Sequence, residues 1–130
     1  MWIYRNPNPH NQLVGDCVVR AISILLDKSW EYAYDEITEQ GRLMYDMPSS
    51  NRVWGQYLIE NGFERKILPD TCPICYSLHQ FCFMHPRGEY LVATGSHVIA
   101  VIDGDYYDTW DSGYETVTYY FQRRNNSPWH

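Results

Sequence analysis

A cysteine, a histidine and two aspartates are placed where together they could form a nucleophilic site. Cys17 follows Gly15-Asp16 and begins an apolar segment, whereas His97, Asp108 and Asp111 lie far along the chain. A thiol is a good nucleophile only as its thiolate, which a helix N-terminus and a neighbouring imidazole both favour. A carboxylate on the far side of the imidazole fixes its tautomer and its orientation. These residue types therefore predict a Cys-His-Asp site.

The segment that begins at Cys17 is predicted to place the thiol at the N-terminus of a buried helix. Asp16 is a good N-cap residue, and the residues up to about Leu26 are almost wholly apolar. The free backbone N–H groups of the first turn would bind the oxyanion that forms when a thiolate attacks a carbonyl. A side-chain amide often supplies a second donor. We expect Gln12 or Asn11 to do so, and prefer Gln12 for its longer side chain.

His97 opens a predicted strand, and the hairpin that follows decides which aspartate it meets. Asp103-Gly104 is a strong signal for a two-residue turn. Because strand residues alternate between faces, this turn places Asp108 on the same face as His97 and diagonally across from it. Asp111 falls on the opposite face unless a bulge or a longer turn shifts the register by one. Both aspartates are therefore candidates for orienting the imidazole.

Arg20 lies on the helix of the candidate nucleophile and would be costly to bury without a partner. We therefore expect it to form an ion pair with Asp16, Asp108 or Asp111. Such a pair would connect the predicted helix to the predicted site.

The order of the predicted elements indicates an α+β fold in a single domain over residues 1–130, with its core in about 6–121. N-caps, glycine stops and apolar spacing predict helices at 17–26, 29–41, 50–61 and from about 71 to just before Pro86. Runs rich in Val, Ile, Tyr and Thr predict strands at 89–93, 97–102, 106–110 and 116–121, with a further candidate at 63–68. Helices first and a meander of antiparallel strands afterwards are typical of the α+β class. The tail, 125–130, is expected to be frayed.

Composition excludes several classes of protein. The net charge is −6 and no basic patch offsets it, which argues against a nucleic-acid partner. The longest uncharged apolar run is too short to cross a bilayer, so no membrane association is expected. We see no signal peptide and expect a cytoplasmic protein, in which the four cysteines are thiols or metal ligands rather than disulfides.

A second cluster offers metal-ligand residue types. Cys72, Cys75, His79 and Cys82 would follow one another along a helix that begins near Ile74, and Cys-x-x-Cys is a common zinc-binding element. A zinc ribbon, however, has a second such pair a dozen or more residues away, and that spacing is missing here. We therefore expect no cofactor, and structural zinc on these four residues is the alternative.

The motifs discussed so far resemble those of small papain-like cysteine peptidases, similar to the peptidase C39 family and of a kind found in phages and prophages. The resemblance spans about residues 6–121. Its motifs are Asp16-Cys17-Val18-Val19-Arg20-Ala21, Cys72-Pro73-Ile74-Cys75-Tyr76, His85-Pro86-Arg87-Gly88-Glu89-Tyr90, Gly95-Ser96-His97-Val98, Asp103-Gly104 and Tyr107-Asp108-Thr109-Trp110-Asp111-Ser112-Gly113. It implies a papain-like fold in which N-terminal helices pack on a C-terminal antiparallel sheet.

By this resemblance Cys17 is the nucleophile and His97 the base. Papain-like relatives place the acid about a dozen or more residues after the histidine. Asp111 lies 14 residues after His97 and Asp108 lies 11 after it, so we favour Asp111. The implied function is hydrolysis or acyl transfer at a peptide or isopeptide bond of a peptide or protein substrate. The alternative is a binding protein on the same fold, a phage or prophage factor that engages a host protein with little or no catalysis.

Overall fold

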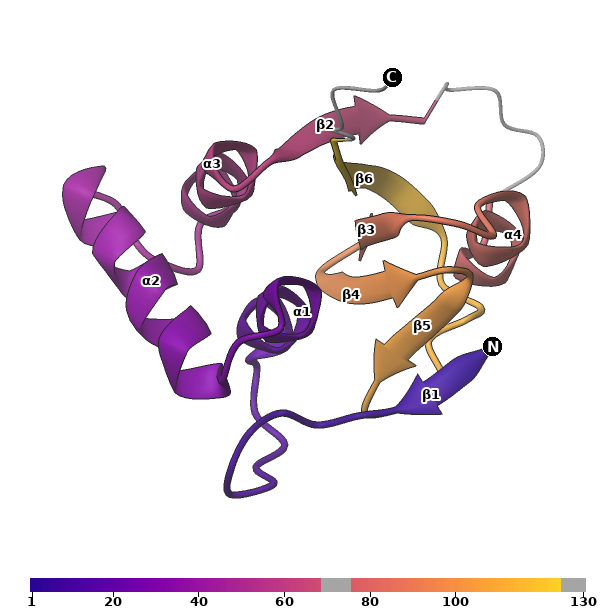
Figure 1. The fold of residues 1–130 in the computed structure, drawn as a ribbon, viewed down its shortest axis with the longest axis horizontal. Helices are drawn as coiled ribbons and strands as arrows, with labels where there is room; N and C mark the ends of the chain where they lie inside the picture. Colours follow the sequence, from indigo (N-terminus) through magenta and orange to yellow (C-terminus); the bar gives the residue numbers. More distant parts are fainter. Residues whose placement is uncertain (69–75, 125–130) are drawn as a thin grey trace.

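Within residues 1–68 and 76–124, which the computed structural model describes, four helices and a six-stranded sheet form a mixed α+β architecture (Figure 1). In chain order the elements are β1 (Trp2–Tyr4), α1 (Cys17–Leu26), α2 (Trp30–Leu43), α3 (Asn51–Glu60), β2 (Phe63–Ile67), α4 (Leu78–Met84), β3 (Glu89–Thr94), β4 (His97–Ile102), β5 (Asp105–Asp108) and β6 (Val117–Arg123). The predicted α+β class is confirmed. The expectation of a frayed tail concerns residues 125–130, which lie outside the described ranges.

The strands have the order β1-β5-β4-β3-β6-β2 across the sheet. β2 to β6 are joined by antiparallel pairs, as predicted, and the candidate strand at 63–68 is confirmed as β2. The predicted meander is wrong in one respect, because β6 pairs with β3 and not with β5. The edge strand β1 was not predicted, and it pairs in parallel with β5, with Trp2 opposite Tyr106. Such a three-residue strand is too short to show a clear alternation in the sequence.

The β4–β5 hairpin has the two-residue turn that the sequence predicts. Ile102 lies opposite Asp105, and the turn residues Asp103 and Gly104 both have positive φ, 50° and 82°. Positive φ at both central residues is the requirement of a type I′ turn, whose twist matches that of the flanking strands. The register of this hairpin fixes which residue of β5 approaches the start of β4.

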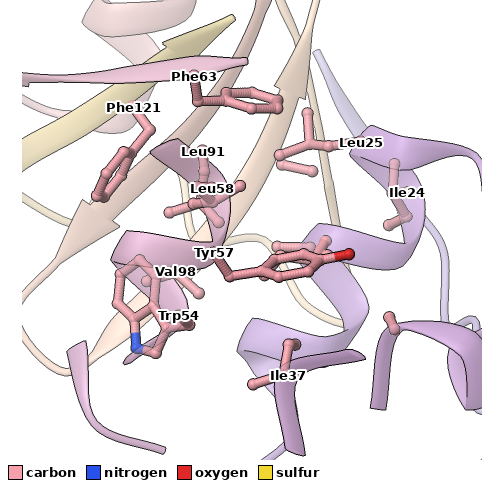
Figure 2. Packing of buried hydrophobic residues seen from close by; sticks show 14 of the residues in the cluster. Ile24, Leu25, Ile37, Trp54, Tyr57, Leu58, Phe63, Leu91, Val98 and Phe121 are labelled. Atoms are coloured by element: carbon pink, nitrogen blue, oxygen red, sulfur yellow. The ribbon is translucent and has the colours of Figure 1, made fainter. Parts of the chain in front are cut away.

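Side chains of the central strands alternate between the two faces of the sheet, and those on both faces are apolar. Helices therefore cover both sides of the sheet and bury these side chains. Leu91 and Ala93 of β3 belong to the core beneath α1, α2 and α3, whereas Tyr90 and Val92 pack in the core beneath α4. Figure 2 shows part of the first core, where side chains of the three helices meet Leu91 and Val98 from the sheet.

α1 is the central helix of the larger layer, and it lies between α2 and the sheet in Figure 1. Its residues from Arg20 to Leu25 are all buried, and it packs against β4. Such burial is the expected result of a helix that is apolar almost all round. Because its first residue is Cys17, packing of α1 places the thiol at the end of the sheet where β4 begins.

Two predicted helix boundaries are wrong. α2 does not end at Gly41 but continues to Leu43. A Cβ atom on Gly41 would come within 2.9 Å of the backbone oxygen of Asp46, so this glycine permits a close approach of the next loop rather than stopping the helix. α4 begins at Leu78, after a capping box between Ser77 and Gln80, and not near residue 71 or 74.

Among the described residues, no helix combines the length and the apolar character needed to cross a membrane.

Candidate active site

Three of the predicted site residues meet at the end of the sheet. Cys17 is the first residue of α1, His97 is the first residue of β4, and Asp108 is the last residue of β5. The thiol of Cys17 is hydrogen-bonded to the imidazole of His97. On the far side of the ring, Nε2 of His97 lies 2.7 Å from Oδ2 of Asp108. Since Nε2 is engaged by the carboxylate, Nδ1 is the ring nitrogen left for the thiol.

The environment of Cys17 favours its thiolate. Burial alone would raise the pKa of the thiol, but hydrogen bonds from the His97 side chain and the Val98 backbone N–H outweigh this effect. The positive charges of His97 and Arg20 act in the same direction, and the pKa of Cys17 lies below its usual 9.0. The free N–H groups at the start of α1 add a partial positive charge at the same point.

The imidazole of His97 is correspondingly held in its protonated form. Burial opposes the charge, but the hydrogen bonds to Asp108 and Cys17 raise the pKa of His97 from 6.5 to about 9. Burial likewise opposes ionisation of Asp108, yet hydrogen bonds from His97 and Ser112 hold its pKa below the usual 3.8. The arrangement therefore favours a thiolate and an imidazolium, with the ring oriented by a carboxylate whose ionised form is also favoured.

Asp108 is almost fully buried and its carboxylate is surrounded by donors. Besides His97, Oδ2 accepts a hydrogen bond from the Ser112 hydroxyl at 2.6 Å. Oδ1 accepts one from the backbone N–H of Thr109 at 2.8 Å and lies 3.5 Å from Nη2 of Arg20. The expected ion pair of Arg20 with Asp108 is thus present, and Arg20 also pairs with Asp16.

Asp111, which we favoured as the partner of His97, lies elsewhere. Its exposed carboxylate accepts hydrogen bonds from the Tyr106 hydroxyl and, at 3.1 Å, from the backbone N–H of Gly113. The structure places Asp108, and not Asp111, on His97 because the β4–β5 hairpin keeps its two-residue turn without a shift of register. The spacing taken from the family resemblance therefore selected the wrong aspartate.

Neither amide expected to complete an oxyanion-binding site lies at the thiol. Gln12 and Asn11 are both exposed, and neither contributes to the wall of the cleft described below. Asn11 adopts a left-handed backbone conformation with a φ of 53°, so the chain turns at this point before it reaches α1. The backbone N–H groups of the first turn of α1 remain candidate donors for an oxyanion beside Cys17.

A cleft of about 680 Å³ opens beside Cys17 and His97. Its walls come from α1 and the residues just before it, from α2, α3 and their connection, from β3 and β4 with the turn between them, and from β6. Most of its side chains are apolar or aromatic: Val14, Val18, Val19, Trp30, Tyr34, Ile37, Pro48, Trp54, Ala93, Val98 and Tyr119. Its remaining lining residues are Gly15, Asp16, Cys17, Thr38, Ser49, Asn51, Thr94, Gly95, Ser96 and His97.

Two neighbours of the site are not among the predicted residues. Ser112 is fully buried and donates to Asp108, although its sequence context reads as a turn. The indole of Trp110 stacks beside the ring of His97, with a centroid distance of 5.3 Å and an interplanar angle of 27°. The only sequence signal for these two residues was their position shortly after Asp108. The residue types of this segment are typical of turns as well as of functional sites, so the sequence did not distinguish the two.

The structure describes two of the four candidate zinc ligands, His79 and Cys82. Cys72 and Cys75 lie outside the described residues. His79 contacts the rings of Tyr106 and Tyr114, and Cys82 is buried. Within the described ranges, no group of three or more His, Cys, Asp and Glu side chains is arranged to hold a metal ion.

Comparison with known proteins gives no match for this chain among protein-family models, curated proteins or solved structures.

Proposed function

We propose that this protein is a cysteine peptidase-like hydrolase or acyl transferase with a papain-like fold, acting on a peptide or isopeptide bond. The observation that supports this most is the direct contact of Cys17 with His97 and of His97 with buried Asp108, beside a cleft. Buried imidazole–carboxylate pairs also occur for structural reasons. A thiol with a lowered pKa at the free end of a helix, in contact with such a pair, is the arrangement that nucleophilic catalysis requires.

In the proposed reaction the Cys17 thiolate attacks the carbonyl carbon and forms a carbon–sulfur bond. Backbone N–H groups at the start of α1 hold the resulting oxyanion. As the carbon–nitrogen bond breaks, the His97 imidazolium donates its Nδ1 proton to the leaving amine. A water molecule, or an amine in acyl transfer, then loses a proton to neutral His97 as it attacks the thioester. Breakage of the carbon–sulfur bond restores the thiolate and the imidazolium, while Asp108 keeps the ring oriented throughout.

The cleft walls favour a substrate with an uncharged, apolar segment near the scissile bond. Apart from Cys17 and His97, the acidic or basic residue in the described lining of the cleft is Asp16, and its carboxylate is already paired with Arg20. A charged substrate group would therefore lose its hydration without gaining a partner. A buried apolar side chain of ordinary size contributes about 1.5–3 kcal/mol, which suffices to orient a peptide in the cleft.

The decisive experiment compares the two thiols that the structure describes. Iodoacetamide at neutral pH, followed by peptide mapping, should modify Cys17 faster than a free model thiol, because the pKa of Cys17 is lowered. Cys82 is the matched control, since burial raises its pKa to about 11. Labelling of Cys82 before Cys17 in the folded protein would contradict the proposal. It would leave the alternative of a binding protein whose cleft captures a partner without chemistry.

A further inference from the structure

The buried guanidinium of Arg20 links two carboxylates that belong to different parts of the molecule. Its side chain is only 9% exposed. Nη1 pairs with Asp16, which directly precedes α1, and Nη2 lies 3.5 Å from Oδ1 of Asp108 at the end of β5. Arg20 therefore connects the start of α1 to the strand that carries the carboxylate of the candidate site.

This bridge closes a ring of contacts around the candidate site. Cys17 contacts His97, His97 contacts Asp108, and Asp108 contacts Arg20, which lies one helical turn after Cys17 on α1. The thiol is carried by the helix, whereas the imidazole and the carboxylate are carried by the sheet. Arg20 thus ties the helical half of the site to the sheet half through a second contact, separate from that of the thiol with the imidazole.

The second carboxylate of the bridge is itself anchored. Oδ2 of Asp16 accepts hydrogen bonds from the indole Nε1 of Trp30 at 3.0 Å and from the amide of Asn8 at 3.4 Å. Trp30 begins α2, and Asn8 belongs to the segment between β1 and α1. Because Asp16 is held from two further elements, the guanidinium has fixed partners at both ends of its fork.

Stability alone is a poor reason for such an arrangement. Removing a guanidinium and two carboxylates from water costs several kcal/mol per ion, and buried bridges are often matched by apolar side chains of similar volume. What a planar guanidinium with two fixed partners provides instead is precise placement, since it holds both carboxylates at defined positions. The position that matters here is that of Asp108, which orients His97 toward Cys17.

We propose that Arg20 is a positioning residue that sets the alignment of His97 with Cys17 by fixing Asp108 relative to α1. The inference rests on the proposed function, because alignment of the two groups has a consequence only if they react. Arg20 itself contacts neither the thiol nor a substrate in this role.

The test replaces Arg20 by lysine, which keeps the charge but cannot span two carboxylates as a fork. We expect a folded Arg20→Lys protein in which iodoacetamide modifies Cys17 about tenfold more slowly at neutral pH. The midpoint of the rate–pH profile should move up by about one unit, since one unit corresponds to a tenfold change in thiolate. Nitrogen chemical shifts of the His97 ring should move with it, because they report the protonation and hydrogen bonding of the imidazole.

The matched control is Arg123→Lys. Arg123 ties the sheet to the other end of α1, where Nη2 donates to the Leu25 carbonyl at 2.7 Å, and it also pairs with Glu89. Its replacement should lower the melting temperature without changing the rate–pH profile of Cys17. If Arg20→Lys behaves in the same way, Arg20 has a structural role only and the inference is wrong.

Two further outcomes keep the tests separate. If Cys17 of the unchanged protein reacts no faster than a free thiol, the proposed function fails before Arg20 is tested. If Arg20→Lys does not fold, the double variant Arg20→Met/Asp16→Asn removes one positive and one negative charge together. Because this variant also removes a positive charge that lowers the pKa of Cys17, its discriminating readout is the set of nitrogen chemical shifts of the His97 ring. It should fold with those shifts moved, and a folded double variant with unchanged His97 shifts would overturn the inference.

Discussion

Two regions of this molecule hold a cysteine, a histidine and an aspartate, and only one of them brings the three into a chain of contacts. At the candidate active site the thiol meets the imidazole, and the imidazole meets a buried carboxylate. Around α4, His79 and Asp111 are both joined to the hydroxyl of Tyr106, at 3.4 Å in the case of His79. Cys82 lies on the same helix, and burial raises its pKa to about 11.

The difference teaches that position on a helix and the neighbours around it together decide the chemistry of a thiol. Cys17 is the first residue of α1, where backbone N–H groups are free, whereas Cys82 lies near the end of α4, where they are already bonded within the helix. Cys17 is partly buried and Cys82 is buried, so burial opposes ionisation in each. At Cys17 the imidazole and the backbone N–H of Val98 reverse that effect.

The largest contrast between the two regions should come from replacing each cysteine. Cys17→Ala removes the proposed nucleophile and should lower peptide hydrolysis or transfer by at least about 10⁴, as loss of a nucleophile does in other triad enzymes. Cys82→Ala should leave the rate within about twofold and lower only stability. Mass spectrometry of a peptide library incubated with each variant measures this. Equal activity of the unchanged protein and Cys17→Ala would end the comparison.

The two aspartates should separate almost as clearly. Asp108→Asn should lower the rate by roughly 10²–10⁴, because an amide cannot stabilise the imidazolium and favours the wrong tautomer. Asp111→Asn should change it by less than about threefold, because the exposed Asp111 contacts Tyr106 and Gly113 rather than His97. Kinetics of both variants on one substrate provide the measurement, and a greater loss in Asp111→Asn would reverse our assignment.

The pH dependence should sharpen the contrast between the thiols. The paired thiolate and imidazolium exist from the lowered pKa of Cys17 up to the pKa of His97, about 9. Hydrolysis should therefore decline above pH 9, when His97 can no longer protonate the leaving amine. Alkylation of Cys82 in the folded protein should rise only near pH 11. A hydrolysis rate that still rises at pH 10 would contradict this prediction.

The same pKa shift of His97 has a consequence for stability. Its pKa is raised on folding, from 6.5 to about 9, so the folded state holds the proton more tightly. The resulting contribution to the free energy of unfolding is complete below pH 6.5 and is lost as the pH rises through about 9. Denaturant titrations of the unchanged protein and of His97→Gln across this range would measure it.

The smallest effect on the site should come from a change in the α4 region. A Cβ atom on Gly113 would lie 2.5 Å from the Tyr106 hydroxyl oxygen and from Nε2 of His79. Gly113→Ala should therefore cost about 1–3 kcal/mol of stability through overpacking. The alkylation rate of Cys17 in the folded variant should not change. A fall in that rate would show that the two regions are coupled.

The elements that could be predicted are those with a strong local signal. The apolar run after Asp16 and the Asp103-Gly104 turn each specify their own geometry, and the structure confirms both α1 and the β4–β5 register. That register alone selects Asp108 as the partner of His97. The wrong preference for Asp111 arose when a spacing from relatives replaced this local argument.

Other features depend on contacts between distant segments and leave no local pattern. Ser112 reads as a turn residue, and only the folded chain shows its hydroxyl on Asp108. Gly41 reads as a helix stop, but its role is set by the approach of the loop at Asp46. We expected Gln12 or Asn11 at the thiol because their side chains are long enough to reach Cys17 from nearby in the sequence. The path of the loop, which the sequence does not reveal, leaves both amides exposed.

The parallel pairing of β1 with β5 has a consequence for how the protein is made. The indole of Trp2 donates to the Asp108 carbonyl across 106 residues of sequence, and the backbone N–H of Arg5 donates to the same oxygen. Contacts of such long range form late, because the intervening chain must first be ordered. Before the ribosome has delivered His97 and Asp108, Cys17 has neither its imidazole nor the carboxylate behind it. Until both residues have been synthesised, the nascent chain therefore carries a thiol without the neighbours that lower its pKa.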